Sequence, residues 1–187
     1  MLARIIDTVG EYAMSFREPE FETLVRSIVY QQLSGRVAAV ILSRLIRAAG
    51  GRLTPETILR LRPVRMRALG LSTQKTAYIR DLARQTRDGH IVFSQLPALP
   101  DQEVIEVLTQ VKGIGVWTAH MFLMFALRRE DILPTGDLGI RSAMRKAYGL
   151  EALPAPDEME RLAQNWRPYC TVASWYLWRS LEGVAAL

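Results

Sequence analysis

The segment Lys112-Gly113-Ile114-Gly115 combines residue types that could bind a phosphate. Glycine allows left-handed backbone angles and the close approach of another molecule, so the N–H groups of Gly113 and Gly115 could point outward at the start of a helix. Such a turn would hold a phosphate through neutral backbone groups, with Lys112 adding charge and Ile114 turned into the core. An ordinary corner between two helices would use the same residues, so both interpretations stay open at this point.

A carboxylate follows about twenty residues later, on a loop rich in glycine and proline. Asp137 stands within the run Leu133-Pro134-Thr135-Gly136-Asp137-Leu138-Gly139-Ile140-Arg141, just ahead of a predicted helix. Aspartate in this place commonly caps a helix by accepting a hydrogen bond from a backbone N–H group. The residues alone leave a capping role and a chemical role both open.

The elements that must position these two segments are predicted to be helices. Apolar residues recur at three- and four-residue spacing, and no run alternates between apolar and polar residues as a half-buried strand would. Thr54-Pro55 and Ser72 are typical helix starts, and Asp101 is a further candidate cap. Two apolar stripes comprise Phe21, Leu24, Val25, Ile28 and Val29, and then Val37, Val40, Ile41, Leu45 and Ile46. Helices are also predicted over 62–69, 140–148, 158–166 and 171–181, with loops at 131–139 and 150–156.

The composition excludes several classes of protein. The chain has 187 residues, of which 49% are hydrophobic and 23% charged, and this excludes disordered, collagen-like and low-complexity proteins. The single cysteine, Cys170, excludes an internal disulfide, a four-thiolate zinc site and an iron–sulfur cluster. A net charge of +5 favours a polyanion as partner. The longest nearly apolar run, 114–127, is too short to span a bilayer, so we expect a cytoplasmic protein without membrane contact.

A hairpin followed by an aspartate on such a loop is typical of the helix-hairpin-helix DNA glycosylase superfamily, also called HhH-GPD. The chain most resembles its 3-methyladenine DNA glycosylase II family, over about 21–178. Further matching segments are Tyr30-Gln31-Gln32-Leu33-Ser34 with Ala38-Ala39, Gly70-Leu71-Ser72 with Lys75 and Tyr78, and Trp166-Arg167-Pro168-Tyr169 leading to Trp175-Tyr176-Leu177-Trp178. All of these segments occur in the order that the family shows.

The resemblance implies an all-α fold of two closely packed helical lobes, with a helix-hairpin-helix motif and an active-site cleft between the lobes. We expect one catalytic unit over 1–187, with no room for the N-terminal β-rich domain of longer family members. The expected division is a first lobe over about 30–128, which includes the hairpin at 108–120, and a second lobe over about 1–29 plus 129–187.

The same resemblance implies a monofunctional DNA glycosylase that flips alkylated purines, such as 3-methyladenine and 7-methylguanine, out of double-stranded DNA and excises them hydrolytically. Asp137 would be catalytic, because a carboxylate facing the sugar stabilises its developing positive charge and can orient water. No cofactor or metal is required, although Na⁺ or K⁺ at the hairpin carbonyls is compatible with the family. The residues expected to bind the DNA backbone are Lys112, Gly113, Ile114, Gly115 and Thr118.

The family's base pocket corresponds to Trp117, Trp178 and Met121. Electron-rich rings bind cationic alkylated bases, although a tryptophan on a helix is more often a core residue, as we expect for Trp166. Met121 stands where some family members carry a tyrosine, which predicts a looser or differently selective pocket. Gln32, or alternatively Leu33, would fill the gap that the flipped nucleotide leaves in the stack. A capped helix end packed between lobes is the alternative for both.

The residue at position 117 also bears on the reaction subclass. Superfamily members that cut the strand carry a lysine at that hairpin position, whose amine forms a Schiff base with the sugar. Trp117 cannot do so, and we therefore expect base excision without lyase activity, by a monomer associated with the nucleoid through DNA. The alternatives are a non-catalytic helix-hairpin-helix DNA-binding module, a glycosylase for oxidised, mismatched or other damaged bases, and an all-α protein-interaction domain.

Overall fold

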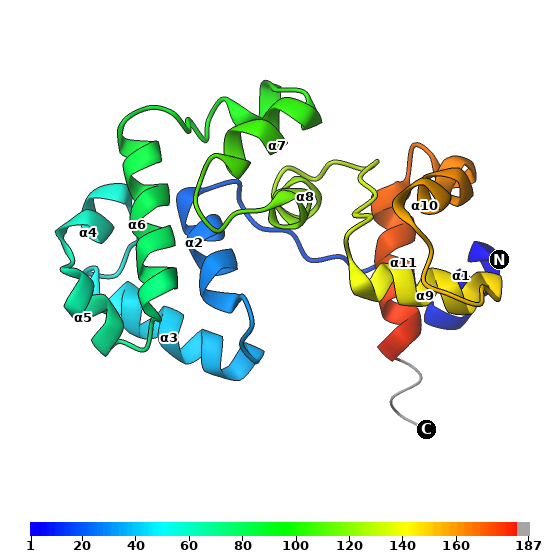
Figure 1. The fold of residues 1–187 in the computed structure, drawn as a ribbon, viewed down its shortest axis with the longest axis horizontal. Helices are drawn as coiled ribbons and strands as arrows, with labels where there is room; N and C mark the ends of the chain where they lie inside the picture. Colours follow the sequence, from blue (N-terminus) through cyan, green and yellow to red (C-terminus); the bar gives the residue numbers. More distant parts are fainter. Residues whose placement is uncertain (183–187) are drawn as a thin grey trace. The chain divides into compact units, whose positions relative to one another are not determined.

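The computed structural model describes residues 1–182, and these residues form helices and connecting loops with no strand (Figure 1). The helices are α1 (Leu2–Val9), α2 (Phe21–Tyr30), α3 (Gly35–Ala48), α4 (Pro55–Arg60), α5 (Pro63–Ala68), α6 (Thr73–Arg87), η1 (Leu96–Ala98), α7 (Asp101–Thr109), α8 (Val116–Phe125), α9 (Leu138–Tyr148), α10 (Pro156–Ala163), η2 (Gln164–Trp166) and α11 (Cys170–Glu182). The all-α prediction is confirmed. No helix in this part of the chain is long and apolar enough to cross a membrane.

The helices form two compact units. Arg17–Phe122 is here called the hairpin unit, and Met1–Phe16 together with Leu123–Leu187 is called the Asp137 unit. The boundaries differ from the expected ones at two places. Residues 17–29 belong to the hairpin unit because α2 packs on α3 and α6. Residues 123–128 belong to the Asp137 unit, where the ring of Phe125 stacks on that of Trp178.

Local capping signals fix the helix starts of the hairpin unit. Thr54 and Thr57 form a reciprocal capping box at the start of α4, with N–H to hydroxyl distances of 3.2 and 2.9 Å. The hydroxyl of Ser72 accepts from the N–H of Lys75 at 3.1 Å and caps α6, as predicted. Asp101 differs from the prediction, because it is the first residue of α7 and Pro100 holds the cap position. The negative charge of Asp101 in the first turn still interacts favourably with the dipole of α7.

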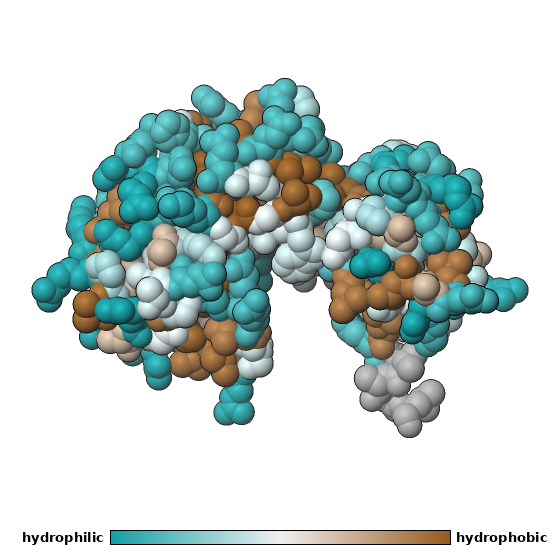
Figure 2. Space-filling view, viewed as in Figure 1, coloured by the Kyte–Doolittle hydropathy of each residue, from teal (hydrophilic) through white to brown (hydrophobic). Residues whose placement is uncertain are grey.

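Helix α3 buries Ile41 and Leu45 as predicted, but the rest of its buried face differs from the predicted stripe. Val37 and Val40 are each 47% exposed, although both were assigned to the apolar stripe. The buried residues of the helix are Ala38, Ile41, Leu42 and Leu45. These four recur at three- and four-residue spacing, so they form a coherent helix face that packs inward while the two valines stay outside it. Apolar side chains accordingly gather on the surface over α3 (Figure 2).

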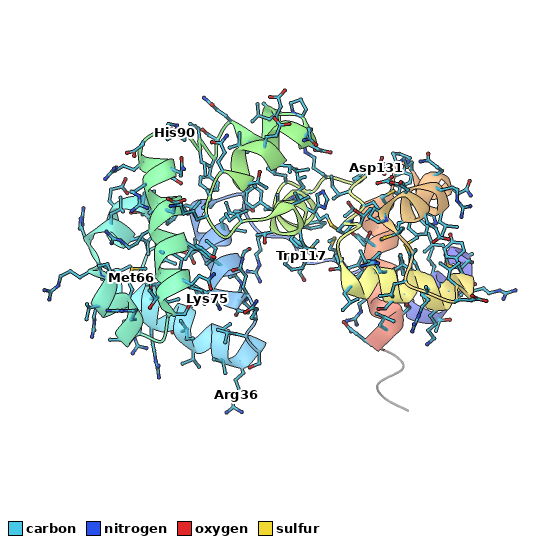
Figure 3. The ribbon with its side chains drawn as sticks, in the orientation of Figure 1. Arg36, Met66, Lys75, His90, Trp117 and Asp131 are labelled. Carbon is cyan, nitrogen blue, oxygen red and sulfur yellow. The ribbon has the colours of Figure 1, made fainter. Side chains whose placement is uncertain are left out.

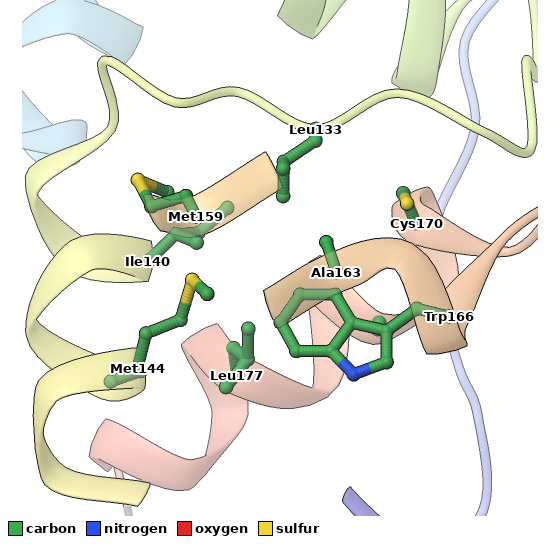
Figure 4. Packing of buried hydrophobic residues seen from close by; sticks show 10 residues of the cluster. Leu133, Ile140, Met144, Met159, Ala163, Trp166, Cys170 and Leu177 are labelled. Atoms are coloured by element: carbon green, nitrogen blue, oxygen red, sulfur yellow. The ribbon is translucent and has the colours of Figure 1, made fainter. Parts of the chain in front are cut away.

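The Asp137 unit is built around α11, which packs against α1 and α9. Its core comprises Leu133, Ile140, Ala143, Met144, Met159, Ala163, Trp166, Cys170, Ala173 and Leu177 (Figure 4). Trp166 belongs to this core, as the sequence predicted. The core holds α9 against α11, and α9 begins immediately after Asp137.

The loop that leads to Asp137 is tied to the start of α11. The hydroxyl of Thr171 donates to the carbonyl of Arg129 at 2.7 Å and accepts from the N–H of Ile132 at 3.1 Å. Asp131 accepts from Arg167 at 2.7 Å, and Arg167 also pairs with Glu160 at 2.7 Å. Because these contacts fix the loop at several points, the aspartate that follows is held on a rigid support.

Candidate functional site

Asp137 is the N-cap of α9, and it is 8% exposed. Its Oδ1 atom accepts from the backbone N–H of Ile140 at 2.8 Å and from the indole N–H of Trp178 at 2.9 Å. Two donors on one oxygen use its lone pairs and fix the plane of the carboxylate. The capping interpretation is thus confirmed, and the same hydrogen bonds hold the carboxylate in a fixed orientation.

The indole of Trp178 is held on its face as well as at its edge. The ring of Phe125 stacks on it with a centroid distance of 6.0 Å and an interplanar angle of 22°. The absence of a side chain at Gly139 lets Trp178 come close to Asp137, because a Cβ atom at position 139 would lie 3.1 Å from both Asp137 Oδ1 and Trp178 Cδ1. Phe125 and Gly139 were not singled out from the sequence, although Gly139 lies in the loop segment that drew attention to Asp137.

The two hairpin glycines differ in what they require. Gly113 has a φ of +84°, and a Cβ atom there would lie 2.0 Å from the ring of Tyr78. Gly115 has no positive φ, and a Cβ atom there would meet nothing within 4 Å. Gly113 is therefore needed by the fold of the hairpin itself, whereas Gly115 leaves open space in front of the N-terminus of α8. Ile114 is buried, as expected of a residue that locks the turn.

The other residues assigned to the hairpin divide by exposure. The side chain of Lys112 is exposed, whereas Thr118 is buried, so Thr118 presents little side-chain surface to a ligand. Thr118 is the third residue of α8, and its N–H belongs to the first turn, where backbone donors lack partners within the helix. A contact to DNA would therefore use its backbone.

Three polar side chains from outside the hairpin hold the hairpin and the adjoining end of α2 in place. The amide of Gln31 donates to the carbonyl of Gly113 at 2.9 Å. The ammonium of Lys75, which extends from α6 toward α2 (Figure 3), donates to the carbonyls of Val29 at 2.8 Å and Gln31 at 2.5 Å. Burial lowers the pKa of Lys75. The end of α2 and the hairpin are thus joined into one polar network.

Asp81 supplies the third of these contacts, and the sequence reading missed it. Its Oδ2 accepts from the backbone N–H of Lys112 at 3.0 Å, and its Oδ1 accepts from Arg84 at 3.0 Å. Burial opposes its ionisation, but the N–H of Lys112 and the guanidinium of Arg84 outweigh burial, so the pKa of Asp81 lies below its usual value. An aspartate among the apolar residues of α6, next to Leu82 and close to Ile79, is the signal that could have revealed it.

The two candidates for filling the stack lie beside the hairpin. Gln32 has a left-handed φ of +55°, and Leu33 is 38% exposed. Both line a cavity of 460 Å³, together with Lys75, Tyr78 and Gly113. The strained, exposed turn at Gln32 and the hairpin glycine therefore share one hollow in the hairpin unit.

The predicted base-pocket residues belong to different units. Trp117 is 46% exposed in the first turn of α8, and Met121 lies one turn later and is half-buried; both are in the hairpin unit (Figure 3). Trp178 is in the Asp137 unit, in contact with Asp137. The core alternative is thus excluded for Trp117, whose ring is largely at the surface.

No three His, Cys, Asp or Glu side chains gather as a metal site anywhere in residues 1–182. The hairpin carbonyls of Val111 and Gly113 each accept one hydrogen bond, from the N–H of Ile114 and the amide of Gln31. Each carbonyl oxygen keeps a second lone pair, and hard cations prefer oxygen ligands, so these atoms fit a Na⁺ or K⁺ ion. The ion stays a prediction.

Comparison with known proteins identifies clear relatives. The family model of the HhH-GPD superfamily base excision DNA repair proteins matches residues 25–168. The DNA-3-methyladenine glycosylase 1 of Schizosaccharomyces pombe is 36% identical, over 95% of this chain and 80% of that protein. A Bacillus subtilis relative is 33% identical over 87% of this chain, and the match spans 59% of that longer protein.

Solved structures show the same similarity. A crystal structure of a DNA-3-methyladenine glycosidase from Bacillus halodurans has a TM-score of 0.89 and 37% identity, covering 99% of this chain and 86% of that one. The Schizosaccharomyces pombe 3-methyladenine DNA glycosylase in complex with abasic DNA has a TM-score of 0.82 and 35% identity, covering 95% of this chain and 89% of that one.

Proposed function

Because the chain belongs to the HhH-GPD superfamily of base excision DNA repair proteins, we propose that it excises alkylated purines from double-stranded DNA. The observation that carries this proposal is the geometry of Asp137, a nearly buried carboxylate oriented by the N–H groups of Ile140 and Trp178. A module that only binds DNA has no need of a carboxylate facing an anionic ligand. Relatives named as 3-methyladenine glycosylases, and one solved with abasic DNA, support the same activity.

Excision of a cationic base requires one main contribution from the protein, a carboxylate positioned next to the sugar. Alkylation at N3 or N7 makes a purine cationic, so the base leaves as a neutral molecule with the electron pair of its bond to C1′. The sugar then carries oxocarbenium character, which the carboxylate of Asp137 stabilises. Water adds its oxygen to C1′, and its proton passes to the carboxylate and then to solvent. The products are a free base and an abasic site.

The surrounding residues supply binding and orientation. The exposed ring of Trp117 offers a face that attracts a cationic base, and each such contact contributes about 1 kcal/mol or more when desolvated. Trp178 fixes the orientation of Asp137 through its indole N–H in addition to lining the base pocket. The open space at Gly115 lets a phosphate reach the N-terminus of α8. Gln32 or Leu33 fills the vacated stack.

We further propose that the protein lacks lyase activity. A Schiff base needs a lysine amine that is free to attack C1′. Position 117 is a tryptophan, and the ammonium of Lys75 is engaged by two backbone carbonyls at the end of α2. Lys112 begins the hairpin at its outer surface, five residues before the position that carries the lysine in strand-cutting members. Incubation with abasic-site DNA tests this, and efficient strand cutting at neutral pH would contradict it.

The decisive experiment compares the native chain with Asp137→Asn on methylated duplex DNA, with the released bases separated by chromatography. We expect release of 3-methyladenine and 7-methylguanine by the native protein and a loss of at least 100-fold in the variant. Asp157→Asn is the matched control, because Asp157 is an exposed carboxylate in the same unit. Equal release by Asp137→Asn would overturn the mechanism. DNA binding without base release by the native chain would favour the binding module, and release of oxidised bases instead would favour another glycosylase.

A further inference from the structure

A second hollow, lined by basic residues, includes Lys112 at the start of the hairpin and lies in the hairpin unit. It has a volume of 380 Å³ and is formed by α5, α6 and Lys112. Four of its lining side chains are cationic: Arg67, Arg80, Arg84 and Lys112. No carboxylate belongs to its lining among the described residues. Asp81 pairs with Arg84 and compensates part of this positive charge, and a bound anion would lower the repulsion that remains among the other cations.

Each of these cations keeps donors that no hydrogen bond with the described residues uses. Arg80 uses Nη1 to hold the carbonyls at the end of α4, that of Leu61 at 2.8 Å being the closest. Arg84 uses Nη2 for Asp81. Arg67 and Lys112 have exposed side chains that form no hydrogen bond or ion pair with the described residues. A planar guanidinium has five N–H donors, so donors of all three arginines remain to bind the oxygens of a phosphate.

The inner wall of the hollow contains an unsatisfied polar group. Thr76 lines it and is 3% exposed, and its hydroxyl has no hydrogen-bond partner among the described residues. A buried hydroxyl without a partner is rare in folded proteins. Because this hydroxyl is itself shielded from solvent, the hollow owes its character to its four cations.

We propose that this hollow binds a second phosphate of the DNA strand whose backbone is bound at Gly113–Gly115. The inference rests on the proposed function in taking DNA as the ligand. Lys112 carries the argument for a strand, because it lines the hollow and directly precedes Gly113. Each strand of DNA carries a phosphate about every 3.4 Å along the helix axis, so a strand held at the hairpin presents further phosphates nearby. The hollow extends the backbone contact along α6.

The test is the salt dependence of binding to an undamaged duplex, measured by fluorescence anisotropy. Each phosphate contact contributes about 0.9 to the slope of log K against log salt concentration. We expect Arg67→Gln to lower the slope by about 0.9, and Arg67→Gln with Arg84→Gln to lower it by about twice that. Arg67→Lys, which keeps the charge, should retain the native slope. Arg52→Gln is the matched control, because Arg52 is exposed in the same unit but outside the hollow, and its slope should equal the native one.

A native slope in both Arg67→Gln and the double variant would overturn the inference. Inorganic phosphate at constant ionic strength separates the two sources of the anion. If phosphate raises the melting temperature of the native chain but not of Arg67→Gln, while the DNA slopes stay equal, the hollow is a site for free anions and the proposal fails. The result is independent of base release: a native chain that excises bases with unaltered slopes in the variants overturns this inference alone, and a chain with no salt-dependent binding overturns both.

Discussion

The indole N–H of Trp178 donates to Oδ1 of Asp137 at 2.9 Å, across 41 positions of sequence. The same oxygen accepts from the backbone N–H of Ile140. A helix start and a side chain from the last helix therefore set the orientation of one carboxylate together. The first two predictions separate this orientation from simple folding of the unit.

Trp178→Phe removes the indole donor and keeps an aromatic ring for Phe125 to pack against. We expect the single-turnover rate of base release to fall by about tenfold, which corresponds to about 1.4 kcal/mol, because the carboxylate loses the indole donor that orients it. Trp175→Phe in the same helix is the control. The rates are measured with saturating protein on methylated duplex DNA, and a native rate for Trp178→Phe would show that the hydrogen bond has no part in catalysis.

Gly139→Ala should separate activity from stability. Alanine in a helix is favoured over glycine by about 1 kcal/mol, which offsets the crowding of a Cβ atom 3.1 Å from Asp137 Oδ1 and Trp178 Cδ1. We expect a melting temperature close to the native one and base release at least tenfold slower. Gly136→Ala is the control, since a Cβ atom there meets nothing within 4 Å. If both variants release bases at the same rate, the close contact does not matter.

Alanine at the two hairpin glycines should affect different properties, the stability of the protein at Gly113 and its affinity for DNA at Gly115. Gly113→Ala combines a φ of +84° with a clash on Tyr78, and we expect it to destabilise the protein by about 2 kcal/mol or more. Gly115→Ala has no internal clash, so stability should stay native while affinity for DNA falls about tenfold, because the methyl group occupies the space in front of the helix N-terminus. Urea denaturation and DNA titration measure the two effects. Native affinity in Gly115→Ala would exclude this turn as the phosphate site.

Asp81 predicts a pH dependence of stability. Burial raises its pKa, but the N–H of Lys112 and the guanidinium of Arg84 lower it further, so the folded pKa lies below the unfolded value of about 3.9. The stabilisation is therefore present above pH 4 and is lost as the pH falls through the folded pKa. We expect Asp81→Asn to cost about 1–2 kcal/mol at pH 7, and this cost to shrink as the pH falls through the folded pKa. Urea denaturation at several pH values measures this, with exposed Asp157→Asn as the control. A pH-independent cost would contradict it.

Cys170 should resist thiol reagents in the folded protein. Burial, together with the carboxyl of Asp131, raises the pKa of its thiol to about 12. The reactive thiolate is therefore scarce at pH 8, and the sulfur is also inaccessible. We expect iodoacetamide to label the native chain at least 100-fold more slowly than the urea-denatured chain, as followed by mass spectrometry. Equal rates would show that α11 opens readily near its first residue.

The parts of the fold that the sequence predicted are those set by neighbouring residues. Thr54 and Ser72 cap helices because their hydroxyls reach N–H groups three residues away. The buried face of α3 depends instead on which helices pack against it, and a purely local pattern placed Val37 and Val40 on that face wrongly. The boundary between the units was displaced for the same reason, because the partners of α2 lie far away in sequence.

In the candidate site, too, residues with local sequence signals were predicted and their distant partners were not. The hairpin glycines and Asp137 were found because their loops carry local signals. The partners that orient them, Trp178 for Asp137 and Asp81 for the N–H of Lys112, lie 41 and 31 positions away. Charged residues are seldom buried, so nothing in the local pattern of α6 pointed to a buried role for Asp81. Trp178 was assigned to the pocket, but its bond to the carboxylate was not foreseen.

The bond from Gln31 to the carbonyl of Gly113 has a mechanical consequence. Since the ammonium of Lys75 also holds the carbonyl of Gln31, hydrogen bonds join the residue that precedes the turn at Gln32 to the hairpin. The hairpin and the turn at Gln32 are therefore two parts of one hydrogen-bonded network. If DNA binds as proposed, with a phosphate at the hairpin and Gln32 or Leu33 in the stack, the spacing between these two contacts would be set by the protein.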